Sequence, residues 1–241
     1  MSLLEVDNLH VAYGKSQALF GVSVEVSRGE LISLVGRNGV GKSTTMRGIM
    51  GLNVPNRGVV RWKGEDISGR DPHLNCRDGI GYIPEDRRIF SDLSVWENLD
   101  VARNYNATST ADSNIAKRWN EESVFTLFPE LADLRNRKGG VLSGGQQQML
   151  TIARSLMGNP ELLLLDEPSE GLAPLVVSRM REGIEQLKEA GLSIVLAEQN
   201  LGFVLALSDR VYVLEKGQVK YSGSAEDLKN NIDIQKQYLT V

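Results

Sequence analysis

The stretch from residue 31 to residue 44 constrains the fold of this chain more than any other part of it. A mostly apolar run, Leu31 to Val35, leads directly into Gly-Arg-Asn-Gly-Val-Gly-Lys-Ser-Thr. This string satisfies the pattern G-x-x-x-x-G-K-[ST], whose glycines let consecutive backbone N–H groups point at an anion near the positive end of the next helix. A strand before the string and a helix after it distinguish a phosphate loop from an ordinary glycine-rich turn. We therefore predict phosphate contacts from Gly36, Arg37, Asn38, Gly39, Val40, Gly41, Lys42, Ser43 and Thr44.

Four side chains predict the chemistry that follows phosphate binding. Lys42 supplies a mobile ammonium group for the outer phosphates, and Ser43 offers a hydroxyl oxygen to Mg²⁺, which prefers oxygen ligands. Four leucines at 162–165 are followed directly by Asp166 and Glu167. Adjacent acids also mark the ends of ordinary strands, but behind a complete phosphate loop a catalytic role is favoured. We expect Asp166 to hold the metal through its water shell and Glu167 to polarise an attacking water.

A second glycine-containing turn lies between these two segments. Ser143, Gly144, Gly145 and Gln146 open a segment whose apolar residues recur at helical spacing. A serine and two glycines at a helix start present a hydroxyl and exposed N–H groups to an anion, although simple capping of the helix is the other interpretation. Two phosphate-sized cradles beside one carboxylate pair indicate a nucleotide held between two copies of the chain.

Hydrophobic periodicity predicts an α/β protein with a largely parallel sheet, because strands and helices alternate with short connections. Helices are predicted to begin after Ser43, after Gly145 and at Ser224. Another is predicted from Ser94 to about Arg103. Others cover 115–128 and 174–190, and residues 104–114 are expected to form an exposed loop. We predict one domain over 1–241 with a mostly helical insertion at about 87–141. Strands are predicted within 4–30 and at 31–35, 59–62, 80–83, 162–165, 193–197, 211–214 and 218–221.

The composition narrows the possible partners. Lys and Arg total 27 against 31 Asp and Glu, a formal net charge of −4, so no basic excess indicates a nucleic-acid surface. A single cysteine fits a reducing compartment. The first residues lack the basic and apolar pattern of a secretory signal, and the apolar runs are too short to cross a bilayer. We expect a cytoplasmic protein whose membrane role, if any, comes through a partner.

Together these motifs resemble the nucleotide-binding subunits of ATP-binding-cassette (ABC) transporters, over nearly the whole chain. The resemblance implies a RecA-like P-loop core with an antiparallel β subdomain and a helical subdomain, ATP and Mg²⁺ as ligands, and a head-to-tail dimer. It implies that Tyr13 stacks on adenine, although a strand aromatic facing the core is an equal alternative from the residues alone. It also implies that Ser143 and Gly145, with Gly144 and Gln146 beside them, bind the γ-phosphate of the opposite subunit's ATP.

Two positions depart from the common pattern of this family. Glu85 follows residues 82–84 where glutamine is usual, and we assign it as a further candidate ligand of Mg²⁺. Gln199 replaces the usual switch histidine, and neither His10 nor His73 matches that position. A glutamine can donate an amide hydrogen bond to the γ-phosphate, but it cannot titrate near neutral pH. We expect ATP turnover that involves Gln199 and lacks a histidine-shaped pH dependence.

These departures occur together with four strings, at 83–90, 142–150, 167–174 and 198–200. The set resembles the LivF-like ATPase of high-affinity branched-chain amino acid importers, and relatives that import urea or short amides share it. Residues 169–174 would form a contact loop of the dimer. In such importers the transported solute is selected mainly by an external solute-binding protein and by the membrane subunits.

The resemblance implies three kinds of partner. The second ATPase is a copy of this chain or a related subunit, integral membrane permease subunits dock on it, and a solute-binding protein acts indirectly. We expect a peripheral location on the cytoplasmic face of the membrane, with docking on residues 85–99 through Phe90 and Leu93. The competing hypotheses are a soluble ABC ATPase acting on ribosomes or DNA, and a subunit that binds ATP without hydrolysing it. Soluble ABC ATPases usually carry paired cassettes or long coiled arms, whereas this chain has one cassette and no heptad repeats, which disfavours the first hypothesis. The presence of Lys42, Asp166 and Glu167 disfavours the second.

Overall fold

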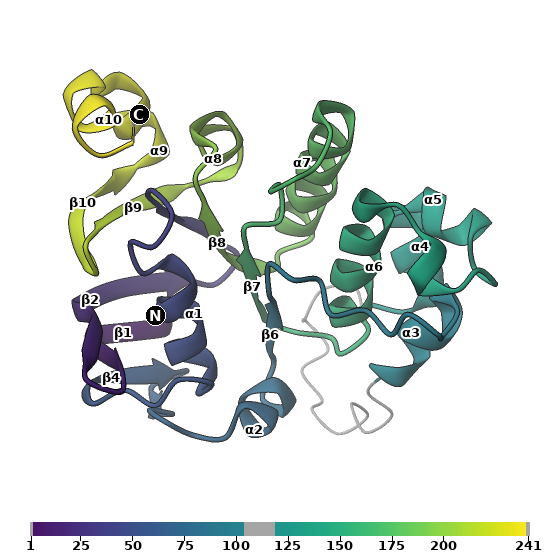
Figure 1. Ribbon diagram of the computed structural model, residues 1–241, viewed down its shortest axis with the longest axis horizontal. Helices are drawn as coiled ribbons and strands as arrows, with labels where there is room; N and C mark the ends of the chain where they lie inside the picture. The colour runs from purple at the N-terminus through teal and green to yellow at the C-terminus, as the bar shows by residue number, and fades with distance from the viewer. Residues whose placement is uncertain (1, 104–118, 240–241) are drawn as a thin grey trace.

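The computed structural model describes residues 2–103 and 119–239, which form two sheets flanked by helices (Figure 1). The larger sheet is parallel except for one edge strand, and the smaller sheet is antiparallel. The larger sheet has the order β10 (Gln218–Ser224), β9 (Arg210–Glu215), β3 (Leu31–Val35), β8 (Ser193–Glu198), β7 (Leu162–Asp166), β6 (Ile80–Ile83). The smaller sheet has the order β2 (Ser16–Ser27), β1 (Ser2–Tyr13), β4 (Arg57–Trp62), β5 (Glu65–Asp66).

The central strands of the larger sheet are apolar throughout because both of their faces are covered. All five residues of β3 and of β7 are buried. Side chains alternate across a strand, so Leu162 and Leu164 of β7 enter one hydrophobic cluster while Leu163 and Leu165 enter another. The unbroken leucine run is therefore the sequence of a strand buried on both sides.

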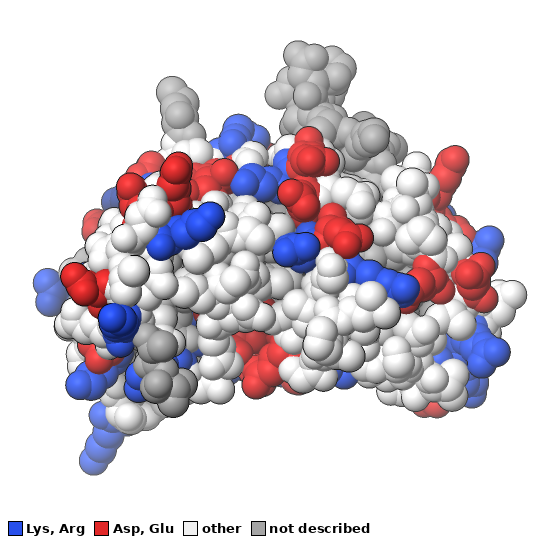
Figure 2. Space-filling model, turned by 90° about the horizontal axis from the view of Figure 1, so that it is seen from above, with Lys and Arg blue, Asp and Glu red and all other residues white. Residues whose placement is uncertain are grey.

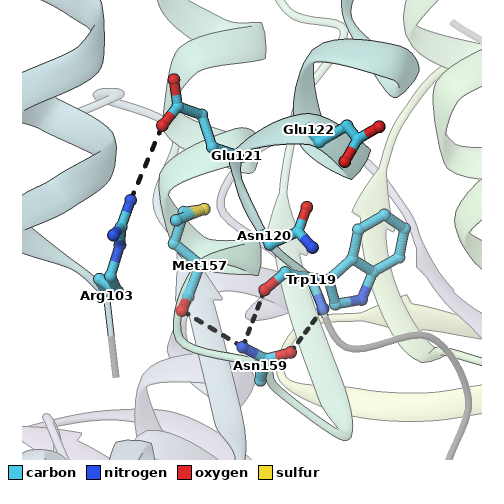
Figure 3. Close-up of a pocket in the computed structure, with 7 residues that line it drawn as sticks. All are labelled: Arg103, Trp119, Asn120, Glu121, Glu122, Met157 and Asn159. Carbon is cyan, nitrogen blue, oxygen red and sulfur yellow. Dashed lines mark hydrogen bonds and ion pairs between the residues drawn. The ribbon is translucent and has the colours of Figure 1, made fainter. Parts of the chain in front are cut away.

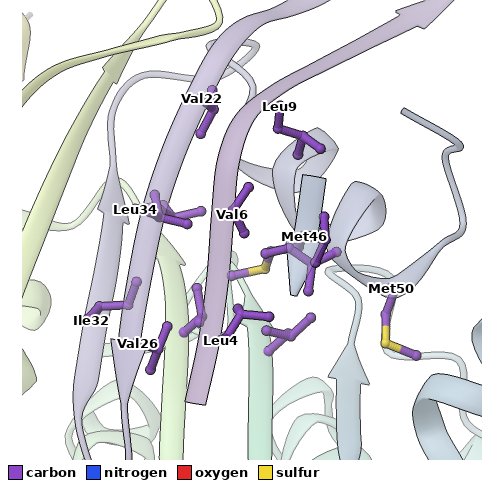
Figure 4. Close-up of a cluster of buried hydrophobic side chains, with 14 of the residues drawn as sticks. Leu4, Val6, Leu9, Val22, Val26, Ile32, Leu34, Met46 and Met50 are labelled. Carbon is purple, nitrogen blue, oxygen red and sulfur yellow. The ribbon is translucent and has the colours of Figure 1, made fainter. Parts of the chain in front are cut away.

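The smaller sheet covers one of these faces. In β2, Val22, Val24 and Val26 are buried while the residues between them are exposed, as the period-two pattern predicts. These valines pack with residues of β1, of β3 and of the helix α1 (Lys42–Met50), including Leu4, Leu34 and Met46 (Figure 4). The phosphate loop thus leads into a helix that is sandwiched between the two sheets.

The other face of the larger sheet is covered by helices. A second hydrophobic cluster joins β7 and β8 to α6 (Gly144–Leu156), α7 (Pro174–Glu189) and the segment between β6 and α6. That segment contains α3 (Val95–Val101), α4 (Glu121–Leu127), α5 (Pro129–Asp133) and a short 3-10 turn at Gly139–Val141. In Figure 1, α3 to α6 lie together on the far side of β6 and β7 from α1.

Most predicted elements are present, with differences at connections. The helix predicted at 115–128 begins later among the described residues, because α4 starts at Glu121 with Asn120 as its N-cap. The side chain of Asn159 binds the backbone N–H and C=O of Trp119 and keeps that residue out of the helix (Figure 3). The loop predicted at 104–114 lies outside the described residues. Sequence reasoning missed α2 (Pro72–Arg77) and α8 (Leu201–Leu207), and it merged α9 (Ala225–Asn230) and α10 (Ile232–Tyr238).

The surface shows mixed charge. Lysine and arginine side chains are interspersed with aspartate and glutamate over the face shown in Figure 2. Within residues 2–103 and 119–239, no helix combines the length and the apolar character that a membrane span requires.

Candidate active site

The register of the larger sheet brings the predicted site residues together. Val35 of β3 pairs with Glu198 of β8, and Asp166 of β7 pairs with Ala197 of β8. The strands are parallel, so the segments that follow their carboxyl ends emerge at one edge of the sheet. The phosphate loop, Glu167 and Gln199 are therefore neighbours although Gln199 lies 155 residues after Thr44 in the chain.

The phosphate loop needs its glycines for steric reasons. Gly36, Gly39 and Gly41 have φ of 159°, 77° and 112°. A Cβ on Gly36 would lie 2.5 Å from the carbonyl oxygen of Leu214, and a Cβ on Gly41 would lie 2.6 Å from Leu19 Cδ2. Gly39 has open space beside it, so its left-handed backbone alone accounts for glycine there. Residues of β2 and β9 thus pack closely against the loop.

Lys42, Glu167 and Gln199, the three predicted catalytic residues, are in direct contact. Lys42 Nζ donates to the carbonyl oxygens of Gly36 and Arg37 at 2.7 and 3.0 Å and forms an ion pair with Glu167 Oε1 at 3.0 Å. Gln199 Nε2 donates to Glu167 Oε2 at 2.9 Å. The amide predicted to face a γ-phosphate thus also holds the carboxylate predicted to activate water.

The backbone at Glu167 has an uncommon conformation. Its φ of 48° is left-handed, and its N–H donates to the carbonyl oxygen of Ala197 on β8 at 2.9 Å. A left-handed non-glycine residue persists only where its surroundings hold it, and such strain clusters at functional sites. The turn aims the carboxylate at the phosphate loop instead of continuing β7.

The carboxylate of Glu167 is held in its ionised form. Burial raises its pKa, but hydrogen bonds with Glu170, Lys42 and Gln199 outweigh burial and lower the pKa below the ordinary value. Glu170 carries the opposite shift. Its hydrogen bond to Glu167, assisted by burial and by the charges of Glu167, Glu85 and Glu198, raises the pKa of Glu170 to about 7. Sequence reasoning missed Glu170, whose one signal is its position three residues after Glu167.

Replacing Glu170 is predicted to change the pH dependence of stability. Its pKa is raised from 4.5 to about 7, so its contribution to stability is complete below the unfolded pKa and is lost as pH rises through the folded one. Glu170→Gln, which cannot ionise, should therefore be more stable than the parent at about pH 8 and equal to it at about pH 4. The difference at pH 8 should be below about 1 kcal/mol because Glu170 is exposed.

Thermal melts of both proteins across this range measure the effect. Glu185→Gln is the matched control, because Glu185 is an exposed glutamate of α7. A Glu170→Gln difference that is the same at every pH contradicts the assignment.

The proposed metal ligands Ser43 and Asp166 touch. Ser43 Oγ donates to Asp166 Oδ1 at 2.8 Å, and Tyr82 donates its hydroxyl hydrogen to Oδ2 at 3.1 Å. Burial raises the pKa of Asp166 while these hydrogen bonds lower it, and the net shift is upward. Burial and the charge of Asp166 raise the pKa of Tyr82 to about 12, so its phenol stays protonated and can donate.

These donors fit Mg²⁺, which is held in proteins by one or two carboxylates together with water and substrate phosphates. In the part of the chain that the structure describes, no group of three or more His, Cys, Asp or Glu is arranged as a metal cage. The donor set therefore suits an ion that arrives with a nucleotide. Glu85 is exposed beyond the end of β6 and its charge acts on Glu170, and its role as a ligand stays a prediction.

Tyr13 does not face the core. Its side chain is 48% exposed, and its hydroxyl lies 3.3 Å from Thr44 Oγ1 and accepts from Asn53 Nδ2 at 2.7 Å. The ring is thus fixed beside the last residue of the phosphate loop. This placement suits the stacking role implied by the resemblance, which itself stays a prediction.

The tip of α6 combines a cap with an exposed hydroxyl. Ser143 Oγ accepts from the N–H of Gln146 at 3.3 Å, and Gln146 Oε1 accepts from the N–H of Ser143 at 2.9 Å, which is a capping box. Ser143 is exposed, while Gly145 is buried. Figure 1 places α6 and the phosphate-loop helix α1 on opposite sides of β6 and β7. A chain therefore presents this tip away from its own phosphate loop.

The structure assigns Gly145 a packing role that sequence reasoning missed. A Cβ there would lie 2.4 Å from Val176 Cγ1 on α7, whereas a Cβ on Gly144 would meet the mobile end of Arg87 at 2.8 Å. Gly145→Ala should destabilise the protein by about 1–3 kcal/mol through overpacking. Gly144→Ala is the matched control because it brings the same gain in helix propensity. Denaturant unfolding measures both, and Val176→Ala should recover part of the loss; equal effects of the two alanines would contradict the packing role.

Comparison with known proteins places these features in one family. Residues 19–170 match the family described as ABC transporter. A high-affinity branched-chain amino acid transport ATP-binding protein, BraG of Pseudomonas aeruginosa, is 41% identical over 98% of this chain and 99% of its own length. A probable LivF of Archaeoglobus fulgidus is 34% identical over 94% of each chain. The lipopolysaccharide export ATP-binding protein LptB of Haemophilus influenzae is 32% identical over 99% of this chain and 98% of its own.

Solved structures agree with this assignment. A nucleotide-free ATP-binding cassette from an ABC transporter has a TM-score of 0.81 and 31% identity, covering 97% of this chain and 96% of its own. The ADP conformation of an ATP-binding cassette of an ABC transporter has a TM-score of 0.80 and 31% identity, covering 98% of this chain and 96% of its own. A dimeric cassette in a post-hydrolysis state, bound to ADP and phosphate, has a TM-score of 0.77 and 25% identity, covering 92% of this chain and 98% of its own. The predicted RecA-like ABC ATPase fold is confirmed.

Proposed function

Because this chain belongs to the ABC transporter family, as an ATP-binding subunit that hydrolyses ATP, we propose that it energises an importer of branched-chain amino acids. The observation that carries the substrate class is the 41% identity to BraG over nearly the full length of both chains, against 32% to the lipopolysaccharide exporter subunit. The strings at 83–90, 167–174 and 198–200 support the same class.

The site residues divide the work of hydrolysis. Gly36 to Thr44 bind the phosphates with backbone N–H groups, and Lys42 moves its ammonium between Glu167 and the outer phosphates. Mg²⁺, held by Ser43 and Asp166, would neutralise charge on the phosphates. Glu167, which its lowered pKa keeps ionised, accepts a proton from water, and Gln199 keeps the carboxylate in place.

The catalytic unit in this proposal is a head-to-tail dimer. Ser143 is exposed at a helix tip that lies away from its own phosphate loop, so a second subunit must supply the matching tip. The dimeric post-hydrolysis cassette among the similar structures supports this arrangement. The second subunit is another copy of this chain or a related ATPase.

Membrane subunits are proposed to dock beside β6. A hollow of about 340 Å³ there is lined by Glu85, Asp86, Arg87, Arg88, Ile89, Ser91 and Gln147. Phe90 is 48% exposed next to it, with the Arg154 guanidinium 5.1 Å from its ring centroid, while Val95 and Leu99 are buried in the protein's own core. Of the predicted contacts, Phe90 is thus better exposed than the half-buried Leu93. Docking would hold the chain on the cytoplasmic face of the membrane, and a solute-binding protein would act through these subunits.

Transport reconstitution tests the proposal. The chain is purified with its membrane partners, placed in vesicles with ATP inside, and supplied with the solute-binding protein from the same host. We expect uptake of leucine, isoleucine or valine that requires ATP. Uptake of urea or short amides instead, or binding to lipopolysaccharide-export subunits, would replace the proposed substrate while leaving the ATPase assignment intact.

A further inference from the structure

The candidate metal carboxylate, Asp166, has one hydrogen-bond donor on each oxygen. Ser43 of the phosphate loop donates to Oδ1, and Tyr82 of β6 donates to Oδ2. Asp166 is fully buried, so its oxygens depend on these protein donors. Ser43 has a predicted role as part of the phosphate loop, whereas the sequence predicts none for Tyr82.

Strand register explains how Tyr82 reaches Asp166. β6 and β7 are parallel neighbours in which Tyr82 pairs with Leu164, two residues before Asp166. The phenol extends along the strand direction and is half-buried against the hydrophobic cluster of the sheet. A side chain held this way has few alternative positions, so its hydroxyl is a fixed donor rather than a mobile one.

Arg47 of α1 acts on Tyr82 in turn. Hydrogen bonding to the hydroxyl groups of Tyr82 and Tyr13 raises the pKa of its guanidinium. An arginine can only donate, so Tyr82 accepts from Arg47 and passes its own hydrogen to Asp166. Tyr13 lies 3.3 Å from Thr44 on its other side. Arg47 therefore connects the exposed aromatic beside the phosphate loop with the tyrosine that donates to the buried carboxylate.

We propose that Tyr82 is a positioning residue for the metal site: its hydroxyl holds the Asp166 carboxylate in the orientation that meets Ser43, and Arg47 holds Tyr82. This inference rests on the proposed Mg²⁺ site. The hydrogen-bonded partners of metal-binding side chains fix ligand orientation, and their removal typically lowers metal affinity by about 10–100-fold. Tyr82→Phe keeps the ring and removes the donor, so it should weaken metal binding by about tenfold.

The test measures metal binding directly, with Mn²⁺ as a spectroscopic probe in place of Mg²⁺. Free Mn²⁺ is titrated by electron paramagnetic resonance against the full chain with saturating ADP, and ADP affinity is measured separately in excess chelator. Tyr82→Phe should weaken Mn²⁺ binding and leave ADP affinity in chelator unchanged. Tyr212→Phe is the matched control, because Tyr212 is a buried tyrosine of the same sheet and its hydroxyl bonds only to the backbone of Glu25 among the interactions of the described residues.

A double mutant separates Arg47's action through Tyr82 from an independent one. If Arg47 acts on the metal site through Tyr82, adding Arg47→Met to Tyr82→Phe causes no further loss of Mn²⁺ affinity. Additive losses would overturn Arg47's part. Mn²⁺ affinity of Tyr82→Phe equal to that of Tyr212→Phe would overturn the whole inference. If the parent protein with ADP fails to bind Mn²⁺, the proposed metal site itself is wrong.

Discussion

Glu167→Gln is expected to reduce ATP hydrolysis by about 10²–10⁴-fold, the range typical of a lost general base. The substitution preserves side-chain shape and removes the carboxylate that accepts the proton from water. Lys42 keeps its bonds to the carbonyl oxygens of Gly36 and Arg37, so the phosphate loop should remain folded and ATP should still bind. Steady-state phosphate release and equilibrium binding of ATP measure the two quantities separately.

Glu161→Gln is the matched control for this experiment. Glu161 is also an ion-paired glutamate, with Arg28 and Lys63, but it precedes β7 and so lies at the opposite end of that strand from Glu167. We expect parent-like hydrolysis from this variant. If Glu167→Gln hydrolyses ATP as fast as the parent, Glu167 is not the base, and Glu170 becomes the next carboxylate to examine.

Ser143→Arg should lower ATP hydrolysis by about 10²–10³-fold, the cost of losing one donor to a developing negative charge. The arginine would project from the exposed tip of α6 into the space that the proposed partner's nucleotide occupies. The capping box shows that Ser143 also stabilises its own helix, with a cost of about 1 kcal/mol when the cap is lost. Thermal melts therefore accompany the rate measurement, and Ser222→Arg, on an exposed position of β10, controls for the added charge.

Mixing two inactive variants tests whether the site is shared between subunits. A chain with Ser143→Arg retains its own Glu167, and a chain with Glu167→Gln retains its own Ser143. In a mixed dimer one site then has both intact residues, so a one-to-one mixture should recover about a quarter of parent activity if subunits assemble at random. An equal mixture that stays inactive, or ATP-bound protein that remains monomeric at high concentration, contradicts the head-to-tail site.

The predicted site residues that the structure brings together share a local signature. Gly36 to Ser43 form a contiguous motif whose backbone conformation depends on its own glycines. Asp166 and Glu167 end a strand that four leucines mark as buried. Parallel strands end at one edge of a sheet, so predicting a parallel sheet was enough to bring these segments together. Gln199 was placed in the site by the same rule, because it follows the end of β8.

Other residues could not be found this way because their roles depend on side-chain positions across elements. Tyr82 acts on Asp166 through the register of β6 against β7, and Arg47 reaches two tyrosines from a helix between the sheets. Gly145 looked like a phosphate contact, and its buried contact with Val176 became visible only when α6 and α7 were packed. The start of α4 was misplaced for a similar reason, since Asn159 binds the backbone of Trp119 from forty residues away.

The amino-acid sequence by itself determined the phosphate loop, the buried strands and the two carboxylates, because each depends on short-range backbone geometry and on hydrophobic periodicity. Only the tertiary structure decided which charged groups meet. The ion pair of Lys42 with Glu167 and the donors on Asp166 depend on distances of about 3 Å between segments that are far apart in the chain. Hydrogen bonds and ion pairs weaken beyond such distances, so the sequence could indicate which side chains belong to this site but could not establish their contacts.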